Sequence, residues 1–130
     1  MMTITSSIDH DRRCMVAIAS GPIGWEEVRS HLHEERLKGG LGYPELIDAR
    51  TATPTWSSAQ TREIVVLLTA FGRESTLGST AVLVSSDFAF GMMRMLRILL
   101  EDVCIVMPFR DYDAAEQWLL ETTGRPIKER

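Results

Sequence analysis

The sequence predicts an α/β fold with the element order β-β-α-β-α-β-α-β-α. Short apolar segments alternate along the chain with longer segments in which apolar residues recur at helical spacing. Such alternation is typical of a mostly parallel sheet covered by helices, here five strands and four helices. With 130 residues, of which 45% are hydrophobic, the chain suits a single domain over residues 1–130.

The N-terminal region predicts a β-hairpin. Residues 2–8 alternate like an edge strand, and residues 13–19 are more uniformly apolar, as in a buried strand. The polar turn Asp9-His10-Asp11 between them makes the first strand antiparallel to the second. Gly21-Pro22 is expected to end the second strand.

Residues 24–38 predict the first helix, because apolar side chains recur on one face and Gly39-Gly40 follows as a stop. A short strand over 44–49 and a loop over 50–56 come next. The apolar face of the helix consists of Trp25, Val28 and Leu32.

A second helix is expected to begin at Ser57, which forms a capping-box pattern with Gln60. Its expected C-cap is Gly72, and a strand buried on both faces follows over 80–85. The buried stripe of this helix is expected to contain Ile64, Leu68 and Phe71.

The third helix is predicted over 88–101, capped by Ser86 or Asp87. A close contact with a neighbouring element, or chance, would explain Gly91 inside it. Its inner face is expected to contain Phe88, Met92, Met95, Leu96 and Leu99, whereas Phe90 and Met93 are expected to point elsewhere.

The C-terminal part predicts a fifth strand over 103–109 and a last helix from the Asp111 cap to about residue 122. Trp118 and Leu119 are expected to face inward. The tail 124–130 is expected to be frayed.

Three segments carry a resemblance to a known family. They are Leu46-Ile47-Asp48, the stretch 90–95 (FGMMRM), and the stretch 106–119, which runs from VMPFRD into AEQWL. With the element order, they resemble the STAS fold, and more closely the SpoIIAA-like group classed with CRAL-TRIO lipid-binding domains. The resemblance implies a STAS-like fold and no common enzymatic activity.

Anti-sigma-type STAS regulators carry a phosphorylatable serine at the start of the second helix. The resemblance places Ser57 and Ser58 there as possible phospho-acceptors, without the Asp and Gly that flank the serine in those regulators. As residues of a helix start, the same serines can instead act only as caps.

The carboxyl ends of the predicted strands form a candidate ligand or partner surface. An anion held there by N–H groups and an Arg is one interpretation, and plain helix capping is the other. The candidate surface contains Asp48, Arg50, Trp56, Ser57, Ser58, Ser86, Asp87, Phe90, Met93 and Arg94.

Phe90 and Met93 have three interpretations: ordinary core packing, a partner or dimer surface, or the wall of a groove for an apolar ligand. Glu27, His31 and Glu35 share one helix face, which could hold a divalent ion, but solvated pairing is the preferred interpretation and no metal site is predicted. No cofactor is predicted.

Several function classes are disfavoured. A net charge of −4 does not suit nucleic-acid binding, and no apolar stretch approaches a membrane span. No nucleophile elbow, P-loop or dinucleotide motif occurs, which leans against an enzyme. Cys14 and Cys104 are expected to be reduced thiols of a cytoplasmic protein.

The resulting prediction is a non-enzymatic regulatory or protein-interaction module, most simply a homodimer, with a possible protein partner. The alternative is a small carrier or sensor of an apolar or amphiphilic, lipid-like ligand. An enzyme using the strand-end polar residues is a third hypothesis.

Overall fold

The computed structural model describes residues 3–124, which form one five-stranded sheet and four helices. The predicted element order is confirmed, whereas the expected tail lies, apart from Gly124, outside the described residues. The elements are β1 (Thr3–Asp9), β2 (Cys14–Ile23), α1 (Trp25–Leu37), β3 (Glu45–Pro54), α2 (Ser58–Glu74), β4 (Thr80–Leu83), α3 (Asp87–Leu99), β5 (Val106–Phe109) and α4 (Tyr112–Thr123).

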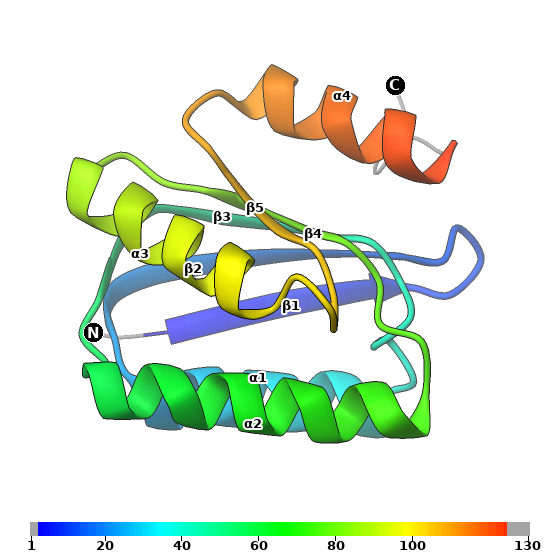
Figure 1. The fold of residues 1–130 in the computed structure, drawn as a ribbon. Coiled ribbons are helices and arrows are strands. Elements are labelled where there is room, and N and C mark those ends of the chain that lie inside the picture. Colours follow the sequence, from blue (N-terminus) through cyan, green and yellow to red (C-terminus); the bar gives the residue numbers. More distant parts are fainter. Residues whose placement is uncertain (1–2, 125–130) are drawn as a thin grey trace.

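The strands lie in the sheet in the order in which they occur in the chain, β1-β2-β3-β4-β5. β1 is antiparallel to β2, and all other neighbours are parallel, as predicted. Connections between parallel neighbouring strands are right-handed. Because each new strand is added at the same edge of the sheet, the helices of these connections lie on one face of the sheet. Accordingly α1 and α2 lie side by side under the sheet in Figure 1, and α4 lies on the opposite side.

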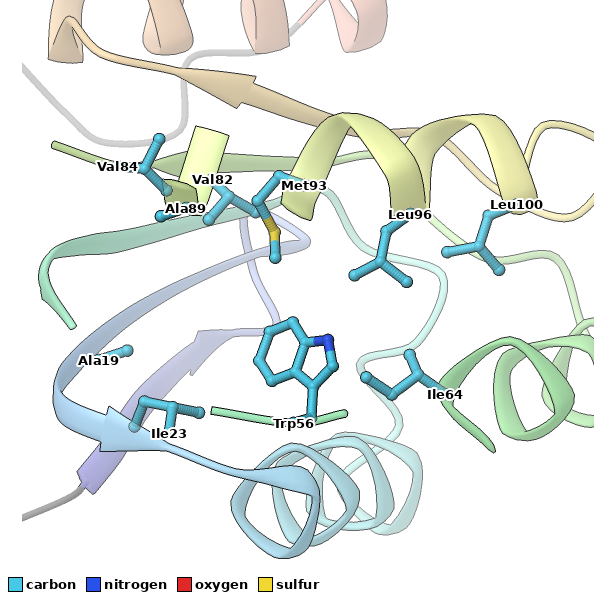
Figure 2. Packing of buried hydrophobic residues seen from close by; sticks show 10 residues of the cluster. All are labelled: Ala19, Ile23, Trp56, Ile64, Val82, Val84, Ala89, Met93, Leu96 and Leu100. Carbon is cyan, nitrogen blue, oxygen red and sulfur yellow. The ribbon is translucent and has the colours of Figure 1, made fainter. Parts of the chain in front are cut away.

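Each face of the sheet has its own apolar core. The core on the first face joins side chains of β2, β4, α2 and α3, and Figure 2 shows its central members. The second core joins Ala115 and Leu119 of α4 to Leu46, Ala81 and Leu83 of the sheet. Cys14 belongs to the second core and Cys104 packs against the first, so the sheet separates the two thiols.

Two strands are longer than the sequence predicted. β2 continues through Gly21-Pro22 to Ile23, and β3 continues through residues 50–54, which were expected to form a loop. The two extensions pair with each other after a register shift between Ile18 and Ser20. Pro22 is tolerated because it lies beyond Ser20, the last partner of β1 among the described residues, so its missing N–H interrupts no hydrogen bond between the strands that the structure describes.

Three element ends also differ from prediction, and one of them is that of β4, which ends at Leu83 and not at residue 85. α2 passes through Gly72 and ends at Glu74, where the Ser75 N–H donates to the Phe71 carbonyl. β5 begins at Val106, not at residue 103, because the N–H groups of Val103 and Cys104 still donate to the carbonyl of Leu100 at the end of α3.

The expected inner face of α3 is correct for Leu96 and partly for Met92, which packs against the first core, and wrong for the other three side chains. The buried side chains are Ala89, Met93, Leu96 and, just after the helix, Leu100, whereas Phe88, Met95 and Leu99 are exposed. α3 is apolar on both sides, so helical periodicity alone does not say which side meets the sheet. Leu96 is the one member of the predicted set that is fully buried.

Gly91 does not mark a close contact. A Cβ atom added there would meet nothing within 4 Å. Because glycine weakens a helix interior, Gly91→Ala is expected to raise the free energy of unfolding by about 0.5–1 kcal/mol. Urea unfolding measures this, with Gly78→Ala as the contrast, since its Cβ would clash with the Tyr43 carbonyl. A destabilised Gly91→Ala variant would contradict the account.

Candidate functional site

A cavity of about 170 Å³ lies between the sheet and the helices α1, α2 and α3. The side chains that form its walls are mostly apolar. The cavity exists because several of these side chains are small, and larger ones at the same positions would fill the space. Ala19 of β2, Ala49 and Ala52 of β3, and Ala89 of α3 all line it. Met93, Leu96 and Ile64 complete the wall on the helical side.

Trp56 forms one end of this cavity. Its side chain is 9% exposed and belongs to the first core. Figure 2 shows Met93 and Leu96 pointing from α3 toward Trp56, whose indole nitrogen faces the space between Leu96 and Ile64. Among the described residues this buried Nε1 atom has no hydrogen-bond acceptor. Such a donor in an apolar cavity is costly unless something accepts its hydrogen bond.

Three ionisable side chains lie in the cavity wall near the amino end of β3. His31 and Glu35 are one turn apart on α1, and Glu45 is the first residue of β3. Their exposed fractions are 8%, 4% and 3%. His31 Nε2 lies 3.0 Å from Glu45 Oε2 and also contacts Glu35 Oε1. We call His31, Glu35 and Glu45 the buried triad.

The pKa values within the buried triad are strongly shifted. Burial by itself would lower the pKa of His31, but its close contacts with the two carboxylates raise it to about 10. Burial, together with the neighbouring Glu45 charge, raises the pKa of Glu35 to about 7 despite the opposing effect of His31. The expected solvated pairing of Glu27, His31 and Glu35 is therefore wrong for His31 and Glu35, while Glu27 accepts a hydrogen bond from the Gly24 N–H.

The predicted residues Asp48, Arg50 and Asp87 belong to two separate ion pairs, the second of which includes Arg110. Arg50 donates to Asp48 over 2.9 Å and 2.7 Å, and this contact holds the pKa of Asp48 below its usual value. Arg110 pairs with Asp87, and its guanidinium lies 5.0 Å from the centre of the Phe90 ring. These charges thus already have partners within the chain.

The structure does not bring the predicted surface residues together. Asp48 and Arg50 lie on the α4 side of the sheet, because they alternate with Ile47 and Ala49 of the cavity wall. Trp56 and Met93, expected on a ligand or partner surface, are buried at the cavity, and core packing or a groove wall was among the interpretations of Met93. Phe90 is partly buried and packs against the first core, and Arg94 is exposed on α3.

The predicted helix caps are present. Ser57 caps α2, since its Oγ accepts from the Gln60 N–H over 3.2 Å while Gln60 returns a bond to the Ser57 N–H. Ser86 caps α3 by accepting from the Ala89 N–H over 3.0 Å. Ser57 and Ser58 are both exposed, and their phosphorylation stays a prediction.

Removing the cap at Ser57 has a defined cost. Ser57→Ala is expected to lower the free energy of unfolding by about 1 kcal/mol, because the Gln60 N–H loses its acceptor. Ser58→Ala, one residue inside the helix, is the matched control and should have little effect. Urea unfolding of both variants measures this, and equal stabilities would contradict the capping role.

Sequence reasoning missed the cavity and the buried triad. The cavity gave no signal in the sequence, because Ala19, Ala49 and Ala52 do not stand out from the residues around them. The buried triad did give one, since Glu45 begins an apolar strand just before Leu46. The polar stripe of Glu27, His31 and Glu35 also lies beside the apolar Val28 and Leu32. What the sequence did not indicate is that α1 turns this stripe toward Glu45.

No helix among residues 3–124 is both long and apolar enough to cross a membrane. Neither a protein-family model nor a curated protein matches the sequence. Among solved structures, the chain is similar to an uncharacterized protein of the DUF3478 family with a SpoIIAA-like fold from Shewanella loihica PV-4. The TM-score is 0.58 at 17% identity, over 92% of this chain and 95% of the other. This comparison gives no support to the CRAL-TRIO part of the resemblance, but it confirms the predicted architecture: the chain has a SpoIIAA-like fold.

Proposed function

We propose that this STAS-like module binds a small apolar molecule in the cavity beside Trp56. The observation that supports the proposal is an apolar space of about 170 Å³ with an unpaired indole N–H on its wall. Well-packed cores contain few voids larger than a water molecule. A cavity of this size that also holds an unused donor is suited to a ligand.

The cavity volume limits the size of the ligand. An engineered protein cavity of about 150 Å³ binds benzene, so about 170 Å³ suits one aromatic ring or a short branched chain. The sequence predicted a lipid-like ligand, and the cavity volume limits the expected class of ligands to compact apolar molecules. The free Nε1–H of Trp56 favours a ligand with one acceptor oxygen.

A pair of probes of similar shape tests this proposal. Acetophenone carries a carbonyl oxygen and ethylbenzene does not. Trp56 is one of three tryptophans, with Trp25 and Trp118, so the ¹H–¹⁵N spectrum of the full chain contains three indole signals. Acetophenone is expected to move the Trp56 signal downfield, and ethylbenzene is expected to shift it less because no hydrogen bond forms.

Trp56→Phe keeps an aromatic ring but removes the donor. It is expected to weaken acetophenone binding roughly 2- to 12-fold, the equivalent of one net hydrogen bond, and to leave ethylbenzene binding nearly unchanged. Trp118→Phe, on the α4 side of the sheet, is the matched control. If neither probe shifts signals of the cavity residues, the proposal is wrong.

A second candidate function, protein interaction, is favoured by the outer face of α3. Phe88, Met95, Ile98 and Leu99 are all exposed, and Ile98 reaches 63%. Clusters of exposed apolar side chains on a helix are typical of contact surfaces. The occupant proposed for this face is a second copy of the chain, which agrees with the predicted homodimer.

Sedimentation velocity over a range of concentrations tests the dimer. Leu99→Glu is expected to convert a dimer to a monomer, because a charge would be buried at the contact. Val66→Glu, at an exposed apolar position of α2, is the control and should leave the dimer intact. A wild-type chain that is monomeric at every concentration would exclude this second function.

A further inference from the structure

The buried triad has the composition and arrangement of a cation site. One ligand atom from each of His31, Glu35 and Glu45 lies within 4.8 Å of the other two. All three residues are more than nine-tenths buried. Two come from successive turns of α1, which places them on one face of the helix, and the third is fixed by the sheet.

The three side chains do not satisfy one another fully. Both carboxylates approach the same His31 nitrogen, Nε2, and one N–H can be directed at only one of them. The hydrogen bond of His31 Nε2 is formed with Glu45 Oε2, at a distance of 3.0 Å. Glu35 Oε1 makes no hydrogen bond among the described residues, although it is buried against the same nitrogen. A buried carboxylate oxygen without a donor is unfavourable.

A divalent cation removes this conflict. On binding, the ion displaces the proton that His31 carries at neutral pH, and this proton passes to the solvent. Two carboxylates and the now neutral imidazole then supply three ligand atoms and two negative charges, which the doubly charged ion neutralises. Nitrogen and oxygen donors of this kind suit first-row transition metals such as Zn²⁺. All three residues also line the cavity, so coordination positions not filled by the protein would face it.

We infer that His31, Glu35 and Glu45 form a binding site for one divalent transition-metal ion, with Zn²⁺ as the representative. The assignment differs from the sequence prediction of no metal. It rests on the position of the three side chains and does not depend on the proposed apolar ligand. Binding of acetophenone in the presence of a chelator therefore tests the ligand proposal separately from the metal site.

Calorimetric titration of the chelator-treated full chain with Zn²⁺ tests the site. One equivalent is expected to bind. Glu35→Gln keeps the size of the side chain but removes a charged ligand, and it is expected to weaken binding by more than about tenfold. Glu34→Gln is the matched control, because Glu34 is exposed on the same helix and pairs with Lys38 over 2.7 Å. This control should bind Zn²⁺ like the wild type.

A measurement on the unaltered chain covers the case in which Glu35→Gln does not fold. The chain has three histidines, His10, His31 and His33, whose ring signals are resolved by NMR. Zn²⁺ is expected to shift the His31 ring signals at one equivalent and to leave those of His10 and His33 in place. The inference is overturned if folded Glu35→Gln binds as tightly as Glu34→Gln, if only His10 or His33 responds, or if no saturable binding occurs.

Discussion

Leu119→Ala is expected to lower the free energy of unfolding by about 2–5 kcal/mol, the range for removing a fully buried leucine. Leu119 is 0% exposed and packs in the core formed with Leu46, Ala81 and Leu83. α4 is the one helix on this face of the sheet in the described part of the chain, and Leu119 is its largest fully buried side chain. No neighbouring helix is available to fill the space that alanine would leave.

Urea unfolding followed by circular dichroism measures this loss. The next residue supplies the control, because Leu120 is 37% exposed and Leu120→Ala removes the same atoms from a position closer to water. That variant is expected to lose less than about 1 kcal/mol. Similar losses for the two variants would mean that α4 does not pack on the sheet through Leu119.

His31→Ala is expected to cost about 3–5 kcal/mol when measured with a chelator present. The substitution leaves Glu35 and Glu45 buried side by side without a cation between them. Removing one partner of a buried ionic group costs this much because the remaining charge has lost its compensation. The loss should be smaller in acid, because protonation of a carboxylate relieves the repulsion.

His33→Ala is the matched control for this prediction. His33 lies two residues further along α1, is exposed, and contacts the edge of the Phe71 ring with centroids 5.5 Å apart. Its removal should cost less than about 1 kcal/mol, the usual size for a surface change. Comparison of the two variants by urea unfolding at neutral and acidic pH measures both parts of the prediction. Equal losses would contradict the burial of the charges around His31.

The element order could be predicted because each element carries its own periodicity. Strand alternation, helical spacing and the caps at Ser57, Ser86 and Asp111 are local features, and all three caps are present. The extension of β3 over residues 50–54 could not be read in the same way. Its threonines and alanines have no clear pattern, and they become a strand because β2 continues beside them.

The candidate site was harder to predict than the fold, because it depends on which elements face each other. Trp56 follows a strand that the sequence ended too early, so its position in the cavity could not be foreseen. The environment of Met93 was left open between core packing, a partner surface and a groove wall, because α3 offers two apolar faces. The cavity itself arises from missing side-chain volume at Ala19, Ala49 and Ala52, which a pattern of apolar residues does not reveal.

The sequential order of the strands has a consequence for how the chain folds as it is synthesised. Each strand from β2 to β5 pairs with the strand made just before it. A chain emerging from the ribosome therefore never has to insert a late strand between two early ones. At each stage the next strand covers the edge opposite β1, which limits the time for which unpaired backbone at that edge is available to other chains. α4 is made after all five strands and shields the second face once β4 and β5 are in place.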